Sequence, residues 1–368
     1  MAVPPVAQSN RPLVSVLIVT YNSAPVIGAC LDSLFHQDYE PLEIVLVDNA
    51  STDGTRALLA SYEPRCRVLE NQSNTGFCAA QNQAIKAAHG EWLLCLNPDV
   101  ILQSDFVRQL VAASDLDPKI GTVCGKLLRW NPGATPEKTS VIDSTGMYFL
   151  RNLRHLDRGA EEEDTGQYDR AEYVFGATGA AALYRRTMVD DTSINGEFFD
   201  EAFFAYREDA DLAWRAQLLG WKCLYTPAAV GWHGRRVTPE RREQLPLEIN
   251  WHSIKNRFLM RIKNISGGLY TRCFLPTTFR DLQIIGYCLL VNRKLLSSLW
   301  YVWTCRSETL AKRREVQNRR RVSDLGRWFT GQRALPVEPA QPAVSLAANP
   351  AEVRAGASAN DEPGTVIR

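Results

Sequence analysis

The chain has 368 residues, with 42 Lys and Arg against 41 Asp and Glu, so its formal net charge is only +1 and we expect no nucleic-acid partner. Its nine Cys stand singly without any CxxC pair, which argues against a disulfide scaffold or a structural zinc site and favours a reducing, cytoplasmic compartment. No apolar run reaches the roughly 18 residues of a membrane-spanning helix, and residues 1–12 lack the pattern of a secretory signal.

Apolar stretches alternate with stretches of helical periodicity through the first hundred residues. Strands are predicted at 14–19, 42–47, 66–69 and 91–96, and helices at 25–37, 55–62 and 76–88. This alternation predicts a parallel sheet with crossover helices. We expect the Pro- and Ala-rich residues 1–12 to be disordered.

The turn after the first strand decides against a nicotinamide dehydrogenase on this sheet. A dinucleotide-binding fold needs G-x-G-x-x-G at this turn. Here residues 20–25 contain no glycine, and the first one is Gly28.

The fourth strand runs straight into Asn97-Pro98-Asp99. Pro98 cannot donate to a sheet ladder, so the strand ends there and Asp99 lies at its carboxyl end. Open α/β sheets bind ligands at this edge, and a carboxylate there suits a divalent cation that carries a diphosphate. The simpler alternative is that Asp99 caps the helix predicted from Ser104.

The second half is less regular. We predict a helix at 104–116, a strand at 120–124, an irregular polar segment at 126–172 with a mobile loop at 151–169, and strands at 174–184, 221–225 and 228–232. The last strand leads to His233 between Gly231 and Gly234, where a metal or phosphate contact is favoured over a packed core histidine.

An acidic cluster follows an aromatic stretch near residue 205. Glu208 and Asp209 begin a predicted helix, and Asp211 lies four residues before Arg215, with which it could pair. Acids at a helix start are commonly caps. Two adjacent acids directly after an aromatic stretch are less common, because burial of a carboxylate without a partner costs free energy.

The C-terminal part predicts amphipathic helices edged by basic residues. Residues 247–262 are amphipathic, 279–303 are strongly apolar, and basic runs stand at 312–314 and 319–321. Such helices can lie in a membrane interface, although a helical subdomain or an oligomer contact is the alternative. We expect residues 331–368 to be a disordered tail.

Taken in order, these motifs resemble the inverting GT-A glycosyltransferases of family 2, especially rhamnosyltransferase-like bacterial members, over residues 14–265. The motifs are Val16–Asn22, Val47–Thr55, Asn74–Asn82, Leu96–Asp99, Gly179-Ala180, Phe203–Leu212 and Trp232-His233. The resemblance implies an α/β GT-A fold: a Rossmann-like, mostly parallel sheet flanked by helices, with a C-terminal helical extension. The implied catalytic domain is 13–240. Its first half, 13–125, would bind the nucleotide sugar, and its second half, 126–240, would bind the acceptor and carry the catalytic base. An amphipathic basic helical region at 241–330 would follow the domain.

The resemblance also implies the roles of individual residues. The residues that would bind the nucleotide sugar are Thr20, Tyr21, Asn22, Asp48, Asn74, Gly76 and Asn97. Asp99 and His233 would hold Mg²⁺ or Mn²⁺. Asp209 would be the catalytic base, with Glu208 and Asp211 as alternatives within the same helical turn.

The implied reaction moves a sugar, with rhamnose as the first candidate, from a dTDP- or UDP-sugar to a glycan or polyprenyl-linked acceptor. This would serve cell-wall or surface-polysaccharide synthesis, with peripheral membrane contact through 247–321 at the inner face of the cell membrane. A sugar-phosphate nucleotidyltransferase is an alternative, but it needs a Gly-rich basic loop after the first strand. A catalytically silent binding subunit is another, yet Asp99, Asp209 and His233 are all present.

Overall fold

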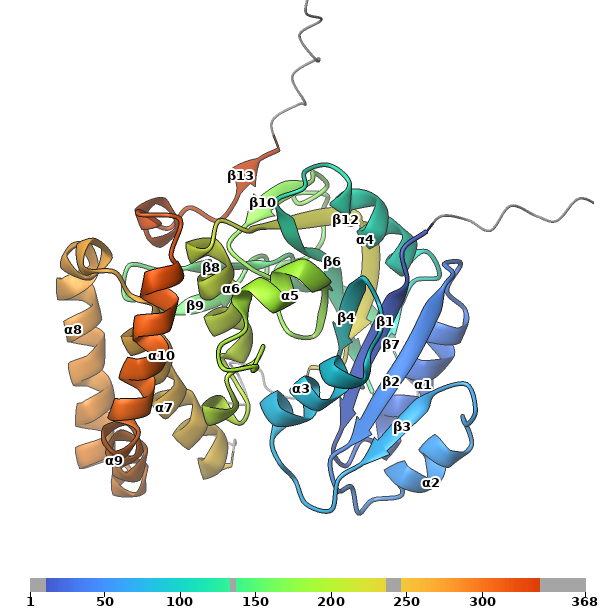
Figure 1. Cartoon of the computed structure of the whole chain (residues 1–368), viewed down its shortest axis with the longest axis horizontal. Coiled ribbons are helices and arrows are strands. Elements are labelled where there is room, and N and C mark those ends of the chain that lie inside the picture. Colours follow the sequence, from blue (N-terminus) through green and yellow to red (C-terminus); the bar gives the residue numbers. More distant parts are fainter. Residues whose placement is uncertain (1–10, 133–136, 236–245, 338–368) are drawn as a thin grey trace, which may run out of the picture. The chain divides into compact units, whose positions relative to one another are not determined.

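The computed structural model describes residues 11–132, 137–235 and 246–337 (Figure 1). Every element below belongs to the compact unit that ends at Pro336. Most of the predicted N-terminal and C-terminal disordered segments lie outside the described residues. The tail prediction is wrong for Leu335–Pro336, which form strand β13 and pair with the sheet.

The N-terminal half confirms the predicted alternation. Its elements are β1 (Val14–Thr20), α1 (Ala24–Phe35), β2 (Leu42–Asp48), α2 (Thr55–Ala60), β3 (Arg67–Glu70), α3 (Phe77–Ala87) and β4 (Trp92–Leu96). The strands are parallel in the order β4-β1-β2-β3. Every residue of β1 is buried, because β1 has a strand on either side and parallel sheets are covered on both faces.

The second half extends this sheet and makes it mixed. Its strands are β5 (Val100–Leu102), β6 (Ile120–Asn131), β7 (Glu137–Ser144), β8 (Met147–Phe149), β9 (His155–Asp157), β10 (Glu172–Val174), β11 (Ala181–Arg185) and β12 (Lys222–His233). Its helices are α4 (Phe106–Ser114), α5 (Arg186–Thr192), the short η1 (Glu201–Phe203) and α6 (Glu208–Leu218). The full order is β13-β10-β12-β6-β11-β4-β1-β2-β3. Outside this order, β5 pairs with β12 and β7 pairs with β6. β11 is antiparallel to both of its neighbours, whereas β6 and β12 are parallel.

Three local predictions differ from the structure. The predicted strand 174–184 is two strands, β10 and β11, which lie in different parts of the sheet. The two strands expected at 221–225 and 228–232 are the single strand β12, whose register with β6 shifts between Tyr225 and Val230. The expected loop at 151–169 contains β9, which pairs with β8.

The C-terminal helices lie together on the side away from β2 and β3 (Figure 1). They are α7 (Leu247–Asn264), α8 (Gly267–Leu290), η3 (Arg293–Leu295), α9 (Leu296–Thr304), α10 (Arg306–Arg319) and η4 (Gly326–Phe329). Aromatic residues of η4 pack into the core: the Phe329 ring lies 5.0 Å from Phe149 and 4.8 Å from Trp214. Among the described helices, none is both long enough and apolar enough to cross a membrane.

The two basic runs of α10 and the residues after it largely bind the body of the protein. Lys312 is buried with its Nζ 2.7 Å from Asp200 Oδ1, Arg319 donates to the carbonyl oxygen of Ser193, and Arg321 pairs with Asp191. The interpretation of these runs as a membrane-facing basic edge is therefore wrong for the buried Lys312, whereas for Arg319 and the 56% exposed Arg321 it stays a prediction.

Candidate active site

A cavity of about 380 Å³ opens at the carboxyl ends of β1 and β4. Four of the predicted donor-side residues line it: Tyr21, Asn74, Asn97 and Asp99. Its opposite wall consists of the loop 204–206 and the first turns of α7, which contribute Glu248, Ile249 and His252. The sheet edge predicted to bind a ligand therefore faces a space large enough for one.

Asp99 lies beside His233, as the metal-site prediction requires. The turn after β4 and the end of β12 meet because β5 pairs with β12, and His233 lies opposite Val100. His233 Nε2 is 3.4 Å from Asp99 Oδ1, and His233 Nδ1 is 2.8 Å from Asp143 Oδ2. Burial would lower the pKa of His233, but the charges of Asp143 and Asp99 outweigh it and raise the pKa to about 10.

The Asp99–His233 pair fits a divalent cation. Two ligands at right angles on Mg²⁺ would lie about 3 Å apart, which is close to the Nε2–Oδ1 separation. A carboxylate on the second ring nitrogen is the usual way in which a metal-binding histidine is oriented, and Asp143 occupies that position. Among the described residues no group of three or more His, Cys, Asp and Glu converges. The remaining ligands would therefore come from a diphosphate and water, as is common for Mg²⁺.

Asp209 has the environment of a general base. Its side chain is partly exposed at the start of α6, where Oδ2 accepts from the Gly179 N–H at 3.1 Å and Oδ1 accepts from the Ala210 N–H at 2.7 Å. Burial and the negative charge of Asp157 raise its pKa, and a raised pKa makes a carboxylate more basic.

Glu208 is buried next to Asp209 and has the more strongly perturbed carboxyl. Burial and the neighbouring charges of Asp209 and Asp211 raise its pKa to about 8. Its Oε2 atom is buried without a hydrogen-bond partner among the described residues. At neutral pH this side chain is mostly protonated, so it suits the role of base less well than Asp209.

Asp211 lies in the core and is not available as a base. It is fully buried, where it pairs with Arg215 at 3.0 Å and Lys263 at 2.9 Å and accepts from Asn264 at 2.8 Å. These partners fix α6 to α7. The assignment of Asp211 as an alternative base is therefore wrong on steric grounds, because no acceptor hydroxyl can reach it.

The segment Gly179-Ala180 connects the two acidic loops. The Gly179 N–H donates to Asp209, and the next carbonyl, that of Ala180, accepts from the Asn97 N–H at 2.8 Å. Consecutive residues thus contact Asp209 on one side and the turn that carries Asp99 on the other. Asp209 is, however, not among the residues that line the 380 Å³ cavity, so a shared cleft for Asp99 and Asp209 stays a prediction.

Three residues predicted to contact the donor do not line the cavity. Thr20 and Asp48 are fully buried and hydrogen-bonded to each other at 3.0 Å. Burial would raise the pKa of Asp48, but bonds from Arg56 and Ser51 outweigh it and hold the pKa below its usual value. Asn22 accepts from the Thr52 N–H at 2.9 Å. The predicted donor contacts of Thr20, Asp48 and Asn22 are therefore not seen in the lining of this cavity.

Asn74 and Gly76 join a small amide network at the cavity edge. Asn49 donates to Asn74 Oδ1 at 2.9 Å and to the Gly76 carbonyl at 3.2 Å. Gly76 has φ +87°, and a Cβ there would lie 2.5 Å from Phe204. Gly76 therefore lets Phe204 close the wall of the cavity.

Several site residues were not predicted as such. Asp143 orients His233 from the irregular segment 126–172, and Glu248 and His252 line the cavity from a helix interpreted as membrane-facing. The role of Asp143 comes from a contact across 90 positions of the chain. No local motif marks any of the three residues.

Comparison with known proteins relates the chain to glycosyltransferases. The family model for Glycosyl transferase family 2 matches residues 15–192. The chain is 29% identical over 235 residues to the N-acetylglucosaminyl-diphospho-decaprenol L-rhamnosyltransferase of Mycobacterium tuberculosis, covering 58% of this chain and 73% of the relative. It is 24% identical to the poly-beta-1,6-N-acetyl-D-glucosamine synthase of Staphylococcus aureus, covering 60% of this chain but only 49% of that protein.

Solved structures share the fold at low sequence identity. GalNAc-T7 with UDP, GalNAc and Mn²⁺ aligns with a TM-score of 0.54 and 16% identity, covering 70% of this chain and 49% of the other. The mannosyltransferase PcManGT from Pyrobaculum calidifontis, in complex with GDP-Man and Mn²⁺, aligns with a TM-score of 0.50 and 20% identity, covering 81% and 76%. Residues 15–192 therefore form a glycosyltransferase family 2 domain, and the fold is that of the GT-A glycosyltransferases.

Proposed function

We propose that the protein transfers a sugar, with inversion, from a nucleotide-diphosphate donor to a glycan or polyprenyl-linked acceptor. The observation that supports this proposal is the Gly179-Ala180 connection, which links the turn of the proposed cation-binding residue Asp99 to the separate carboxylate of Asp209. The M. tuberculosis relative is by name a rhamnosyltransferase with a diphospho-decaprenol acceptor. We therefore favour rhamnose and a lipid-linked acceptor in cell-wall or surface-polysaccharide synthesis.

The residues divide the chemistry between them. Asp209 takes the proton from the acceptor hydroxyl as that oxygen attacks the anomeric carbon, and one carboxylate suffices because a single displacement inverts the centre. Asp99 and His233 would hold Mg²⁺ or Mn²⁺, which when bound neutralises the charge that develops on the leaving diphosphate. Tyr21, Asn74 and Asn97 line the cavity that would hold the donor nucleotide.

A nucleotide-sugar screen tests the proposal on the full chain. Thermal shift is measured with UDP-, dTDP- and GDP-sugars, with and without Mn²⁺, and transfer is then assayed with the stabilising donor. Asp209→Asn should keep the donor-dependent thermal shift and lose about 10²- to 10⁴-fold in kcat. The exposed Asp190→Asn, on α5, is the matched control and should retain full activity.

Two results would count against these roles. A near-normal rate for Asp209→Asn would move the base to another residue. Equal donor affinity for Asp99→Ala and the parent, with and without chelator, would remove the metal assignment.

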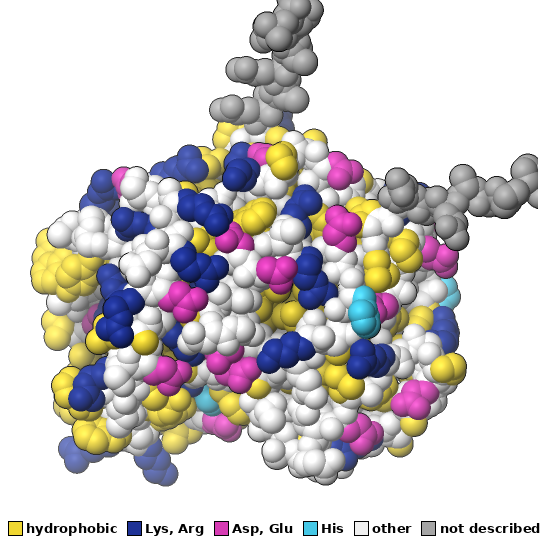
Figure 2. All heavy atoms as spheres, viewed as in Figure 1, with side chains coloured by type: hydrophobic (Ala, Val, Ile, Leu, Met, Phe, Trp, Pro, Cys, Tyr) yellow, Lys and Arg dark blue, Asp and Glu magenta, His cyan; other side chains and the backbone are white. Residues whose placement is uncertain are grey.

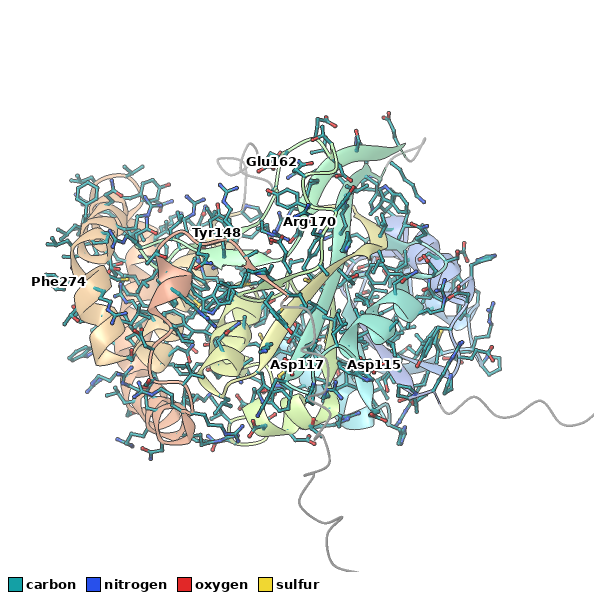
Figure 3. All side chains as sticks on the ribbon, turned by 90° about the horizontal axis from the view of Figure 1, so that it is seen from above. Asp115, Asp117, Tyr148, Glu162, Arg170 and Phe274 are labelled. Atoms are coloured by element: carbon teal, nitrogen blue, oxygen red, sulfur yellow. The ribbon has the colours of Figure 1, made fainter. Side chains whose placement is uncertain are left out.

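The surface of α8, α9 and their connection supports contact with an anionic membrane. Eleven of the 15 exposed large hydrophobic side chains among the described residues lie here: Tyr270, Phe274, Leu275, Phe279, Leu282, Tyr287, Leu289, Leu290, Val291, Trp300 and Trp303. Figure 2 shows hydrophobic side chains along this margin, interrupted by Lys and Arg, and Figure 3 shows Phe274 pointing outward from α8. Exposed Arg293, Lys294 and Arg306 border the surface. Apolar aromatic groups edged by cations suit a lipid interface.

Vesicle sedimentation at low salt tests this contact. The full chain should sediment with vesicles that contain anionic lipid, and Trp300→Ser combined with Trp303→Ser should weaken sedimentation, because these side chains are 67% and 58% exposed. The control is Leu116→Ser, which removes a similarly exposed side chain elsewhere. Failure of the parent protein to sediment would refute the contact.

A further inference from the structure

A second cavity, of about 610 Å³, lies between α7 and α8. The two helices form a hairpin, in which Arg257 of α7 pairs with Asp281 of α8 at 3.2 Å. Arg154, from the turn between β8 and β9, and Arg207, from the residue before α6, reach the same cavity. This space is separate from the donor cavity, with which it shares no lining residue.

The lining of this second cavity is cationic, and of its four arginines Arg257 is the one paired with Asp281. Arg154, Arg207, Arg257 and Arg280 contribute four guanidinium groups, and no carboxylate is among the described side chains that line it. The positive charge of these arginines also acts on the neighbouring His155, whose pKa is lowered well below its usual value by burial and by the charges of Arg207 and Arg154. Guanidinium groups with planar donors are the side chains best suited to phosphate oxygens.

The cavity is directly connected to the catalytic loop. Arg207 immediately precedes Glu208 and Asp209, and its guanidinium donates to the carbonyl and the hydroxyl of Ser253 on α7. Asn256 of α7 donates to the carbonyls of Ala205 and Tyr206 in the same loop. α7 is thus the common wall: His252 faces the donor cavity, and Ser253 faces the cationic one.

The other end of the cavity is apolar and leads to the exposed hydrophobic surface. Ile254, Ile284 and Leu295 line this end, together with Tyr287, which is 46% exposed. Tyr287 precedes Leu290 and Val291, the exposed end of α8. A molecule that filled the cavity would therefore meet cations near Asp209 and apolar side chains toward α9.

We propose that this cavity binds the diphosphate of an isoprenoid-linked acceptor, with its arginines on the phosphate oxygens and its apolar end on the first isoprene units. This deepens the proposed function and rests on it for the identity of the acceptor. The arrangement would present the acceptor sugar to Asp209 while the lipid leaves over α8 and α9.

Binding and kinetics with Arg280→Gln test the proposal. Within the part of the chain that the structure describes, Arg280 hydrogen-bonds to Gln283 of its own helix at 3.1 Å, so its replacement leaves the contacts between elements intact. Titration of the full chain with farnesyl diphosphate, without donor, should show an affinity about 10-fold weaker for the variant, as expected for the loss of one charged hydrogen bond. Acceptor KM should rise similarly, with donor KM unchanged. Arg272→Gln, an exposed arginine of the same helix paired with Asp324, is the control.

The remaining arms separate the alternatives. Inorganic pyrophosphate should bind more weakly than farnesyl diphosphate, and equal affinity would overturn the isoprenoid part. Competition between farnesyl diphosphate and UDP would place the ligand in the donor cavity and overturn the site. Weaker binding to Arg280→Gln without detectable transfer would support the cavity and count against the proposed reaction. Transfer with unchanged acceptor KM in both Arg280→Gln and Arg280→Glu would support the proposed reaction and overturn the cavity as the acceptor site.

Discussion

Gly76→Ala would test how closely the donor cavity depends on one backbone position. Gly76 has φ +87° and ψ 161°, a conformation that is essentially restricted to glycine. A Cβ there would lie 2.5 Å from Phe204 Cδ2, whereas ordinary contact begins at 3.4 Å. Phe204 lines the cavity and stacks on His252 with ring centroids 4.9 Å apart.

The magnitude follows from two costs. The backbone strain amounts to about 1–3 kcal/mol. Displacing the Phe204 ring by about 0.9 Å, the difference between 3.4 and 2.5 Å, adds an overpacking cost of about 1–3 kcal/mol. At roughly 2 °C per kcal/mol for a chain of this size, Tm should fall by about 4–12 °C. Because Phe204 would move against the cavity wall, donor KM should rise as well.

The assay is a thermal melt combined with donor kinetics, and Gly196→Ala is the control. Gly196 has φ +78° in an exposed turn, and no described atom lies within 4 Å of the position that a Cβ would take, so its substitution carries only backbone strain of about 1–2 kcal/mol. Gly196→Ala should lower Tm slightly and leave donor KM unchanged. If Gly76→Ala changed Tm and donor KM no more than Gly196→Ala, the reasoning about Phe204 would be refuted.

The other predictions concern the acids of α6. Asp211→Asn removes the carboxylate between buried Arg215 and Lys263, so the free energy of unfolding in urea should fall by about 3–5 kcal/mol. The protein that remains folded should keep its kcat. A variant that is stable but inactive would instead support Asp211 as the base. Glu208 has a folded-state pKa of about 8, above the ordinary 4.5, so its favourable contribution is complete below pH 4.5 and is lost as the pH rises through 8. Glu208→Gln should therefore gain stability relative to the parent as the pH rises from about 5 to 9, and a pH-independent difference in the free energy of unfolding would contradict this.

The N-terminal half could be predicted closely from the sequence, because its signals are local. The run of apolar and β-branched residues in β1 and the helical spacing in α1 each mark an element without reference to the rest of the chain. The end of β4 was also predictable, since Pro98 stops the ladder. Asp99 and His233, which the family resemblance implies as metal ligands, are brought together by the pairing of β5 with β12.

The rest of the site depends on contacts that no local pattern records. Glu208, Asp209 and Asp211 lie within one helical turn, and only the packing of α7 against α6 distinguishes the buried, ion-paired Asp211 from the partly exposed Asp209, which is the proposed base. Asp143 has no neighbouring motif, and its role appears only when β7 brings it to His233. The α7 residues have an amphipathic pattern that is equally compatible with a membrane face and with a cavity wall.

The buried Asp200 has a practical consequence for truncated forms of this enzyme. Its carboxylate pairs with Lys263 of α7 and Lys312 of α10, and it directly precedes the loop that leads to Asp209. The match to the family ends at residue 192, so a fragment designed on that match, or one ending at 240, would lack both lysines. The longer fragment would contain nearly every strand of the sheet and still leave the buried carboxylate of Asp200 without either lysine. Expression trials should therefore extend at least through α10.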